Sequence, residues 1–297
     1  MTLFIVLWLI ASLVIGLFGL ILFFDGKKLP PWLTVIYKYG KLLRDLNNEE
    51  RSVSGLLLIR WIQVPKRYFS HFYGIAVILH LIVLLSSLFH VDSVRQILNT
   101  PLNLLFGAYK YDGVNVYLFF LLSMIHIFRR FIESVFIAVP SFAKINLIHY
   151  LTGIGFYISI ALYNANNLFS TVLITQDRPY LYTVGLIFYV IGQVLQFHSH
   201  KILSELRRRN DKPRGKAGYY LPHGGLFEFV SCPNYFSELV IYSGLYMLTN
   251  LNANWLAILI WVYSNQIVAS LLNHKWYKQA FGSRYPARRK AIIPYIL

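Results

Sequence analysis

Residues 3–24 read LFIVLWLIASLVIGLFGLILFF and contain no charged side chain. A helix needs about 20 apolar residues to cross the hydrocarbon core of a bilayer, so this stretch alone predicts a membrane span. A secretory signal peptide would have a basic segment before it and an Ala-x-Ala cleavage pattern after it, and neither is present. We interpret the stretch as a retained first span of an integral membrane protein.

Further apolar windows follow at roughly 69–90, 114–138, 145–166, 180–200, 234–251 and 253–272. Charged residues make up 13% of the chain, against about 25% in an ordinary soluble domain. Each window is expected to be helical, because lipid cannot satisfy an open backbone. The predicted fold class is an all-α integral membrane bundle of about seven transmembrane helices. Residues 1–67 would hold the first span and a basic amphipathic cytosolic segment, and residues 68–297 a six-helix core.

The positive charges are distributed unevenly among the expected loops. The net charge is +16, and 25 of the 28 lysines and arginines fall in loops on one side of the predicted bundle. By the positive-inside rule, the N-terminus should be lumenal or outside and the C-terminus cytosolic. Basic chains also bind nucleic acids, but the apolar runs argue for membrane lipids as partners and against nucleic acid. The single cysteine, Cys232, excludes an internal disulfide and a cysteine zinc cluster, and no metal is expected.

Ionisable side chains inside spans are costly and are candidates for function. Most of those in this chain fall near the cytosolic ends of the predicted spans, although His80 and His149 do not and are interpreted as structural. The candidates are His71, His80, His126, Arg129, Arg130, Glu133, His149, His198, His200, Glu228, Glu238 and His274.

Arg129, Arg130 and Glu133 form a cluster at three- and four-residue spacing on the third predicted span. Two interpretations remain open at this point. The group is either a structural ion pair at the membrane interface, or one arginine reaches a phosphate while Glu133 orients it.

Residues 221–238 read LPHGGLFEFVSCPNYFSE, a glycine turn followed by the start of a helix. Ser231 is predicted to cap this helix, and Pro233 suits its first turn. Asn234 and Glu238 are four residues apart and share one helical stripe. Their amide and carboxylate would hold either a carboxamide or ribose hydroxyls, or a neighbouring helix.

Basic residues lie close to aromatic ones in the C-terminal stretch from residue 274 to residue 290. His274 and Tyr277 lie on one helical face near its start. The pattern suits a nucleotide phosphate and equally suits lipid headgroups.

These two stretches resemble the C-terminal domain of the steroid 5-alpha-reductase family, membrane reductases that use NADPH. The family's Pro-x-Gly-Gly-x-Phe, Val-Ser, Asn-Tyr and Glu pattern is present from Pro222 to Glu238. Its His-x-x-Tyr, Tyr-Pro, Arg-Lys and Ile-Pro ending is present from His274 to Pro294. The resemblance therefore implies that residues 68–297 form a reductase core with C-terminal NADPH-binding motifs.

Within the family, the chain is most similar to the polyprenol/polyprenal reductase branch. Residues 64–73, VPKRYFSHFY, and residues 129–134, RRFIES, resemble the corresponding segments of that branch. Two departures from other relatives favour the same branch. Tyr220 stands where many relatives have an arginine, and His200 where the steroid enzymes have an aspartate.

The resemblance also implies roles for individual residues. The cofactor-binding set would place Asn234 and Glu238 at the nicotinamide, Arg130 and Arg207 at the phosphates or ribose, and His274 and Tyr277 beside the cofactor. Candidate donors to the substrate carbonyl are His71, Tyr73 and His274.

The implied activity is NADPH-dependent reduction of the alpha-isoprene double bond of a long-chain prenyl lipid, polyprenal or polyprenol, toward dolichol. Such an enzyme would support lipid-linked N-glycosylation from the endoplasmic reticulum membrane. One alternative is a reductase of the same fold acting on 3-oxo-4-ene steroids or enoyl thioesters. Others are a non-enzymatic seven-helix transporter or receptor, and a prenyl-cysteine methyltransferase-like enzyme using S-adenosylmethionine.

Overall fold

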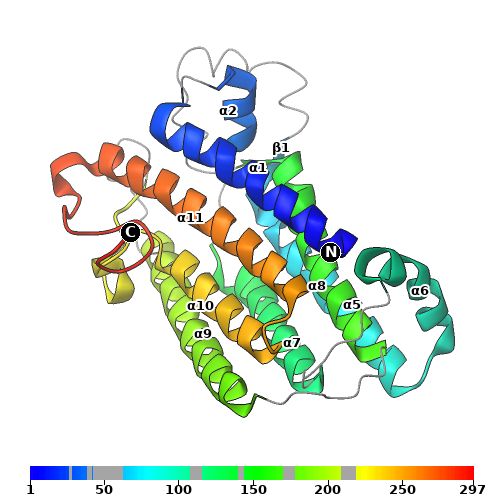
Figure 1. Ribbon diagram of the computed structural model, residues 1–297. Helices are drawn as coiled ribbons and strands as arrows, with labels where there is room; N and C mark the ends of the chain where they lie inside the picture. Colours follow the sequence, from blue (N-terminus) through cyan, green and yellow to red (C-terminus); the bar gives the residue numbers. More distant parts are fainter. Residues whose placement is uncertain are drawn as a thin grey trace.

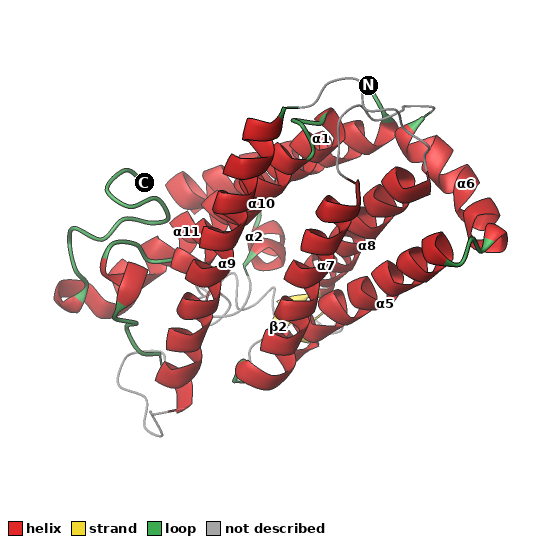
Figure 2. Cartoon of the chain, turned by 90° about the horizontal axis from the view of Figure 1, so that it is seen from below, coloured by secondary structure: helices red, strands yellow, loops and turns green. Residues whose placement is uncertain are grey.

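The computed structural model describes residues 1–26, 29–38, 42, 63–107, 116–139, 144–169, 178–208 and 219–297. Most of these residues belong to helices, which confirms the predicted all-α class. The strands within the described residues are short, β1 (Gln63–Pro65) and β2 (Lys144–Asn146), and they pair antiparallel. Figure 2 shows the helices gathered into one bundle.

Among the described residues, four helical segments are long and apolar enough to cross a membrane. They include α1 (Leu3–Asp25), α5 (Phe69–Leu88), α9 (Pro179–Arg208) and α11 (Ala253–Phe281). Short 3-10 turns extend two of them, η3 (Lys66–Tyr68) before α5 and η6 (Gly282–Arg284) after α11. Four of the predicted windows therefore correspond to candidate membrane-spanning helices.

The other three predicted windows are also helices, but they are not among those four. They are α7 (Val116–Ile132) with its π-helical end η4 (Glu133–Ile137), α8 (Leu147–Phe169) and α10 (Pro233–Leu248). The α10 helix has only 16 residues, and α7 and α8 carry polar side chains that they bury inside the bundle. Polar residues that face a bundle interior lower a helix's mean hydropathy without exposing charge to lipid.

Two helices were not predicted. The α6 helix (Asp92–Phe106) follows α5 and stands at one end of the bundle in Figure 1. The short α2 helix (Pro31–Tyr37) lies within the basic segment 25–67, and most of the rest of that predicted amphipathic segment lies outside the described residues.

The α9 and α10 helices pack closely side by side, as Figures 1 and 2 both show. Gly185 of α9 faces Gly244 of α10, and a Cβ atom added at Gly244 would lie 2.6 Å from the Gly185 carbonyl oxygen. Small residues let helix backbones approach in this way inside membranes. This close pairing brings the polar residues of α9 to the first turns of α10.

The α1 helix lies across α11 and ties the N-terminal segment to the rest of the bundle. Trp8 and Trp261 are in contact, with ring centroids 5.2 Å apart. At the other end of α1, Lys275 Nζ donates a hydrogen bond of 2.7 Å to the Phe23 carbonyl. The core between the helices is rich in aromatic rings, with Trp255 fully buried against Phe119 and Tyr163.

Candidate active site

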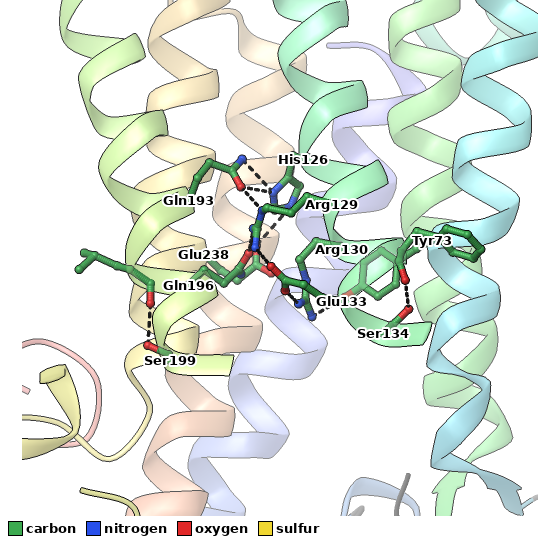
Figure 3. Close-up of polar contacts among 12 residues, drawn as sticks. Tyr73, His126, Arg129, Arg130, Glu133, Ser134, Gln193, Gln196, Ser199 and Glu238 are labelled. Carbon is green, nitrogen blue, oxygen red and sulfur yellow. Dashed lines mark hydrogen bonds and ion pairs between the residues drawn. The ribbon is translucent and has the colours of Figure 1, made fainter. Parts of the chain in front are cut away.

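The first polar group of the bundle, here named the arginine cluster, joins α7 to α9 (Figure 3). Glu133 is buried and forms ion pairs with both Arg129 and Arg130. Arg129 also donates hydrogen bonds to the side-chain oxygens of Gln193, at 2.6 Å, and Gln196. The ion pairs expected from the spacing are therefore present, whereas contact of either arginine with a phosphate stays a prediction.

The backbone around Glu133 departs from a regular helix. The π-helical segment η4 begins at Glu133, and Ala138 N donates to the Glu133 carbonyl at 2.8 Å. Single π-helical turns inside α-helices are rare and occur frequently at functional sites. The segment widens the last turn of α7 where the Glu133 carboxylate meets the two guanidinium groups.

Arg130 connects the arginine cluster to α5. Its Nη2 donates a hydrogen bond of 3.1 Å to the Tyr73 hydroxyl, and the guanidinium carbon lies 5.1 Å from the centre of the Tyr73 ring. The Tyr73 ring in turn packs edge-on against Tyr157 of α8, at 5.0 Å between centroids. The Tyr73 side chain is therefore fixed on two sides, by Arg130 of α7 and by Tyr157 of α8.

Glu238 of α10 approaches the same region from the opposite side. Its Oε2 lies 3.8 Å from His126 Nε2, and His126 Nδ1 lies 3.2 Å from Gln193 Nε2. Figure 3 shows Glu238 next to Gln196 and the Arg129 guanidinium. Side chains from α5, α7, α9 and α10 thus converge on one buried polar region.

A second group, here named the C-terminal network, joins Ser231, His274, Tyr285 and Lys290. Ser231 Oγ lies 2.6 Å from His274 Nδ1, bonds to the Tyr285 hydroxyl, and donates to the Lys290 carbonyl at 3.1 Å. The Tyr285 hydroxyl also lies 3.0 Å from His274 Nδ1. Burial raises the pKa of Tyr285, so its phenol stays protonated near neutral pH and serves as a donor in this network.

Backbone hydrogen bonds hold the two family motifs together at the C-terminal network. Lys290 N donates to the Phe229 carbonyl and Ser231 N to the Lys290 carbonyl, each at 2.8 Å. These bonds form an isolated parallel bridge between Val230 and Lys290. Segments that are far apart in sequence therefore meet at the start of α10.

The prediction that Ser231 caps α10 is wrong. Cys232 precedes the helix and no side chain caps it, because the Ser231 hydroxyl is engaged with the two motif residues His274 and Tyr285. Pro233 does stand in the first turn, as predicted.

The glycine turn before α10 is held by Glu228, which lies in the 3-10 turn η5 (Gly225–Glu228). Gly224 has φ +90°, a conformation that favours glycine, and its N–H donates to Glu228 Oε1 at 2.6 Å. This hydrogen bond is the main reason that the pKa of the Glu228 carboxyl lies below its ordinary value. The buried Arg289 donates to the Pro222 carbonyl at 3.2 Å, and its Nη2 lies 4.0 Å from Glu228 Oε2.

The structure brings together several residues that the sequence singled out. Arg130, Glu238 and Tyr73 lie around the arginine cluster. His274 belongs to the C-terminal network, and the buried Tyr277 stacks on Tyr285 with centroids 6.2 Å apart. Asn234, in the first turn of α10, lies one turn before Glu238 and next to the network in sequence.

Two predicted site residues form their hydrogen bonds outside these groups. His71 is exposed, with Nδ1 2.9 Å from the Tyr150 hydroxyl and its ring stacked on Tyr68. Arg207 is exposed at the end of α9 and donates to the Val139 carbonyl at 3.2 Å. His80, expected to be structural, is buried with Nδ1 2.7 Å from the Ala76 carbonyl.

Two glutamines of the arginine cluster were not among the residues predicted from the sequence. Gln193 and Gln196 are three residues apart in an otherwise apolar span, and Gln196 is fully buried. Polar residues in a membrane span generally face the bundle interior, so this spacing was a usable signal.

The arginine cluster has the donors to hold a ligand with acceptor oxygens. Arg130 Nε is buried and has no hydrogen-bond partner among the residues that the structure describes. Buried donors are rarely left unpaired, and an amide or phosphate oxygen would satisfy this one. The site chemistry therefore fits a dinucleotide cofactor, which supplies both kinds of oxygen.

Comparison with known proteins identifies the family. Residues 142–297 match the family described as 3-oxo-5-alpha-steroid 4-dehydrogenase. The chain is 31% identical to a polyprenal reductase of Xenopus tropicalis over 86% of this chain and 88% of the relative. It is also 31% identical to those of Mus musculus, over 98% and 94%, and Homo sapiens, over 80% and 79%. The chain therefore belongs to the steroid 5-alpha-reductase family, in which it groups with the polyprenal reductases.

Proposed function

We propose that this oxidoreductase uses NADPH to reduce the alpha-isoprene double bond of polyprenal, toward dolichol and thereby in support of lipid-linked N-glycosylation. The observation that carries the proposal is the meeting of the two family motifs at Ser231, His274 and Tyr285, in a chain that resembles polyprenal reductases over most of its length. The arginine cluster supports it, because it offers partly buried cationic donors next to the Glu238 carboxylate.

The cofactor would supply the hydride, which leaves binding, orientation and proton management to the protein. In this proposal the Asn234 amide and the Glu238 carboxylate hold the carboxamide of the nicotinamide. Arg130 and Arg207 hold phosphate or ribose oxygens, and His274 and Tyr277 line the cofactor.

Tyr73 is the proposed donor to the enal carbonyl oxygen. That oxygen gains negative charge as the double bond is reduced, and a positioned donor stabilises such charge most strongly in a water-poor site. Arg130, which donates a hydrogen bond of 3.1 Å to the Tyr73 hydroxyl, would hold the phenol in position so that its own O–H can donate to the carbonyl oxygen. His274 is the second candidate, since its imidazole is held by Ser231.

We further propose that α7, α8 and α10 also cross the bilayer, which makes seven spans. With the basic loops on the cytosolic side, the N-terminus is lumenal and the C-terminus cytosolic. The enzyme would reside in the endoplasmic reticulum membrane, where its lipid substrate can enter between helices and NADPH can bind from the cytosol.

The test is an assay of purified full-length protein in lipid nanodiscs with NADPH and polyprenal. We expect oxidation of NADPH that depends on the enal, with formation of the saturated aldehyde. Parallel assays replace one component at a time. NADH in place of NADPH tests the cofactor, and polyprenol or a 3-oxo-4-ene steroid in place of polyprenal tests the substrate class. If NADPH oxidation did not depend on the enal, the proposal would be overturned. If the steroid were reduced faster than polyprenal, the protein would instead be a steroid reductase.

A Glu238→Gln variant tests the proposed cofactor contact. If the carboxylate accepts a hydrogen bond from the carboxamide of NADPH, its loss should raise the KM for NADPH, with a correspondingly weaker thermal stabilisation by NADPH. Unchanged turnover and NADPH affinity would remove Glu238 from the site. The methyltransferase alternative predicts thermal stabilisation by S-adenosylmethionine instead of by NADPH, and the same measurement tests it.

A further inference from the structure

An apolar groove runs between α1 and α11, away from both polar groups. It encloses about 330 Å³, and its walls are almost wholly hydrocarbon. The residues that shape it include Gly16 and Leu20 of α1, and Ile260, Tyr263, Ile267 and Val268 of α11. Its lining includes two residues with hydroxyls, Tyr263 and Ser264, and the Tyr263 hydroxyl is already paired, 2.9 Å from Ser243 Oγ. The groove therefore presents methyl groups and ring faces to whatever fills it.

The outer stripe of α11 connects this groove to the C-terminal network. Ile260, Ile267 and His274 follow one another at seven-residue intervals, and such positions drift by only about 20° per heptad around a helix. His274 therefore continues the groove wall, about 10 Å beyond Ile267 along the helix. Leu256 and Ile260, earlier on this stripe, are each 38% exposed. A hydrocarbon chain lying along the stripe would end at His274.

We propose that this groove holds a stretch of the prenyl chain of the substrate. The first isoprene units would lie along the stripe between Ile267 and His274, and the oxygenated end would meet His274, the second of the two candidate donors. This inference rests on the proposed function and adds the site for the substrate's tail. An engineered apolar cavity of about 150 Å³ binds benzene, so the α1–α11 groove has room for roughly two or three five-carbon units. The rest of a long chain would continue into the bilayer.

The C-terminal network favours a prenyl aldehyde over a phospholipid as the occupant. Ser231 and Tyr285 hold the His274 ring through Nδ1, so the ring would present one neutral group to a single small carbonyl oxygen. A phospholipid would bring a bulky, charged phosphate to the same place. The groove thus supplies affinity for the chain, and the network supplies recognition of its end.

Gly16 offers a direct way to fill the groove. A Cβ atom at Gly16 would meet no atom within 4 Å, so a Gly16→Leu variant projects its side chain into the groove without a clash. Ile260→Trp fills the same space from the α11 side. Gly155→Leu is the matched control, since a Cβ at Gly155 also meets nothing within 4 Å but lies on an exposed face of α8, outside the groove lining.

The readout is kcat/KM for a long-chain polyprenal divided by kcat/KM for citral, which has the same reacting end on a much shorter chain. Displacing the chain from an apolar pocket should lower this ratio on the order of tenfold in both groove variants. The Gly155→Leu control should keep the ratio of the unmodified protein.

The possible results separate the two proposals. Ratios that match the unmodified protein in both groove variants would overturn the groove assignment and identify the occupant as a bulk membrane lipid. If the ratio fell equally in the Gly155→Leu control, the groove assignment would also be overturned, because any added side chain facing lipid would then have the same effect. If the unmodified protein reduced neither enal, the proposed function itself would fail, and the groove assignment with it.

Discussion

The arginine cluster and the C-terminal network are built in opposite ways. In the arginine cluster, Glu133 holds two arginines from its own helix, at three- and four-residue spacing. In the C-terminal network, Ser231 reaches His274 and Tyr285, which lie 43 and 54 residues further along the chain. The first is a local arrangement of full charges, and the second a long-range arrangement of neutral donors and acceptors.

This difference predicts different sensitivities. Removing one charge from a buried ion pair leaves its partners uncompensated in a poorly polarisable interior, which is costly. Removing one hydroxyl from a neutral network leaves weaker groups unpaired. The arginine cluster should therefore control stability and charge at the site, and the C-terminal network the alignment of the motifs.

The largest effect is expected for Glu133→Gln, which leaves Arg129 and Arg130 without their carboxylate. Breaking a buried pair by removing one partner costs about 3–5 kcal/mol. The measurement is the free energy of unfolding in nanodiscs, with Asp92→Asn, at an exposed carboxylate in the first turn of α6, as the control. If Glu133→Gln and Asp92→Asn had the same free energy of unfolding, the charges of the arginine cluster would not form a buried group.

Tyr73→Phe extends the comparison to catalysis and rests on the proposed function. Loss of one donor to a developing oxyanion lowers kcat by about 10²–10³-fold. His71→Ala is the control, because His71 is exposed and bonded to Tyr150 instead of the arginine cluster. A larger loss of kcat in His71→Ala than in Tyr73→Phe would transfer the donor role to His71.

Ser231→Ala should have an intermediate effect. The variant leaves His274 and Tyr285 without a shared partner in a buried position, at a cost of about 1–3 kcal/mol. Ser159→Ala, which removes a single hydroxyl bond within α8, provides the comparison. Thermal unfolding of both variants measures the difference, and equal midpoints would argue against a tightly coupled network.

The smallest effect concerns pH and Glu228. Since folding lowers the pKa of this carboxyl, its stabilising contribution is present above the unfolded glutamate pKa of about 4.3. It is lost as the pH falls through the lower folded pKa. The side chain is 41% exposed, so solvent screening keeps the contribution below about 1 kcal/mol.

The matched measurement compares unfolding of the unmodified protein and Glu228→Gln at neutral and acid pH. The two should differ in stability at neutral pH, and this difference should shrink on acidification. A difference that stays constant with pH would mean that the hydrogen bond from Gly224 does not depend on the charge of Glu228.

The chain's sequence by itself determined the features that depend on local spacing. Uninterrupted apolar runs predict membrane helices wherever they occur, and Arg129, Arg130 and Glu133 are bound to meet because residues three and four apart share a helix face. The two C-terminal motifs likewise carry the family resemblance as linear patterns. None of these inferences needs to know which helices are neighbours.

Only the tertiary structure decided which distant groups meet. It placed Gln193 and Gln196 on Arg129, and it took Ser231 away from the helix end to join His274 and Tyr285. It also set the partners of two residues of α5, because Tyr73 meets Arg130 whereas His71 meets Tyr150. The physical reason is that contacts between helices depend on how whole faces pack, and no short stretch of sequence encodes that packing.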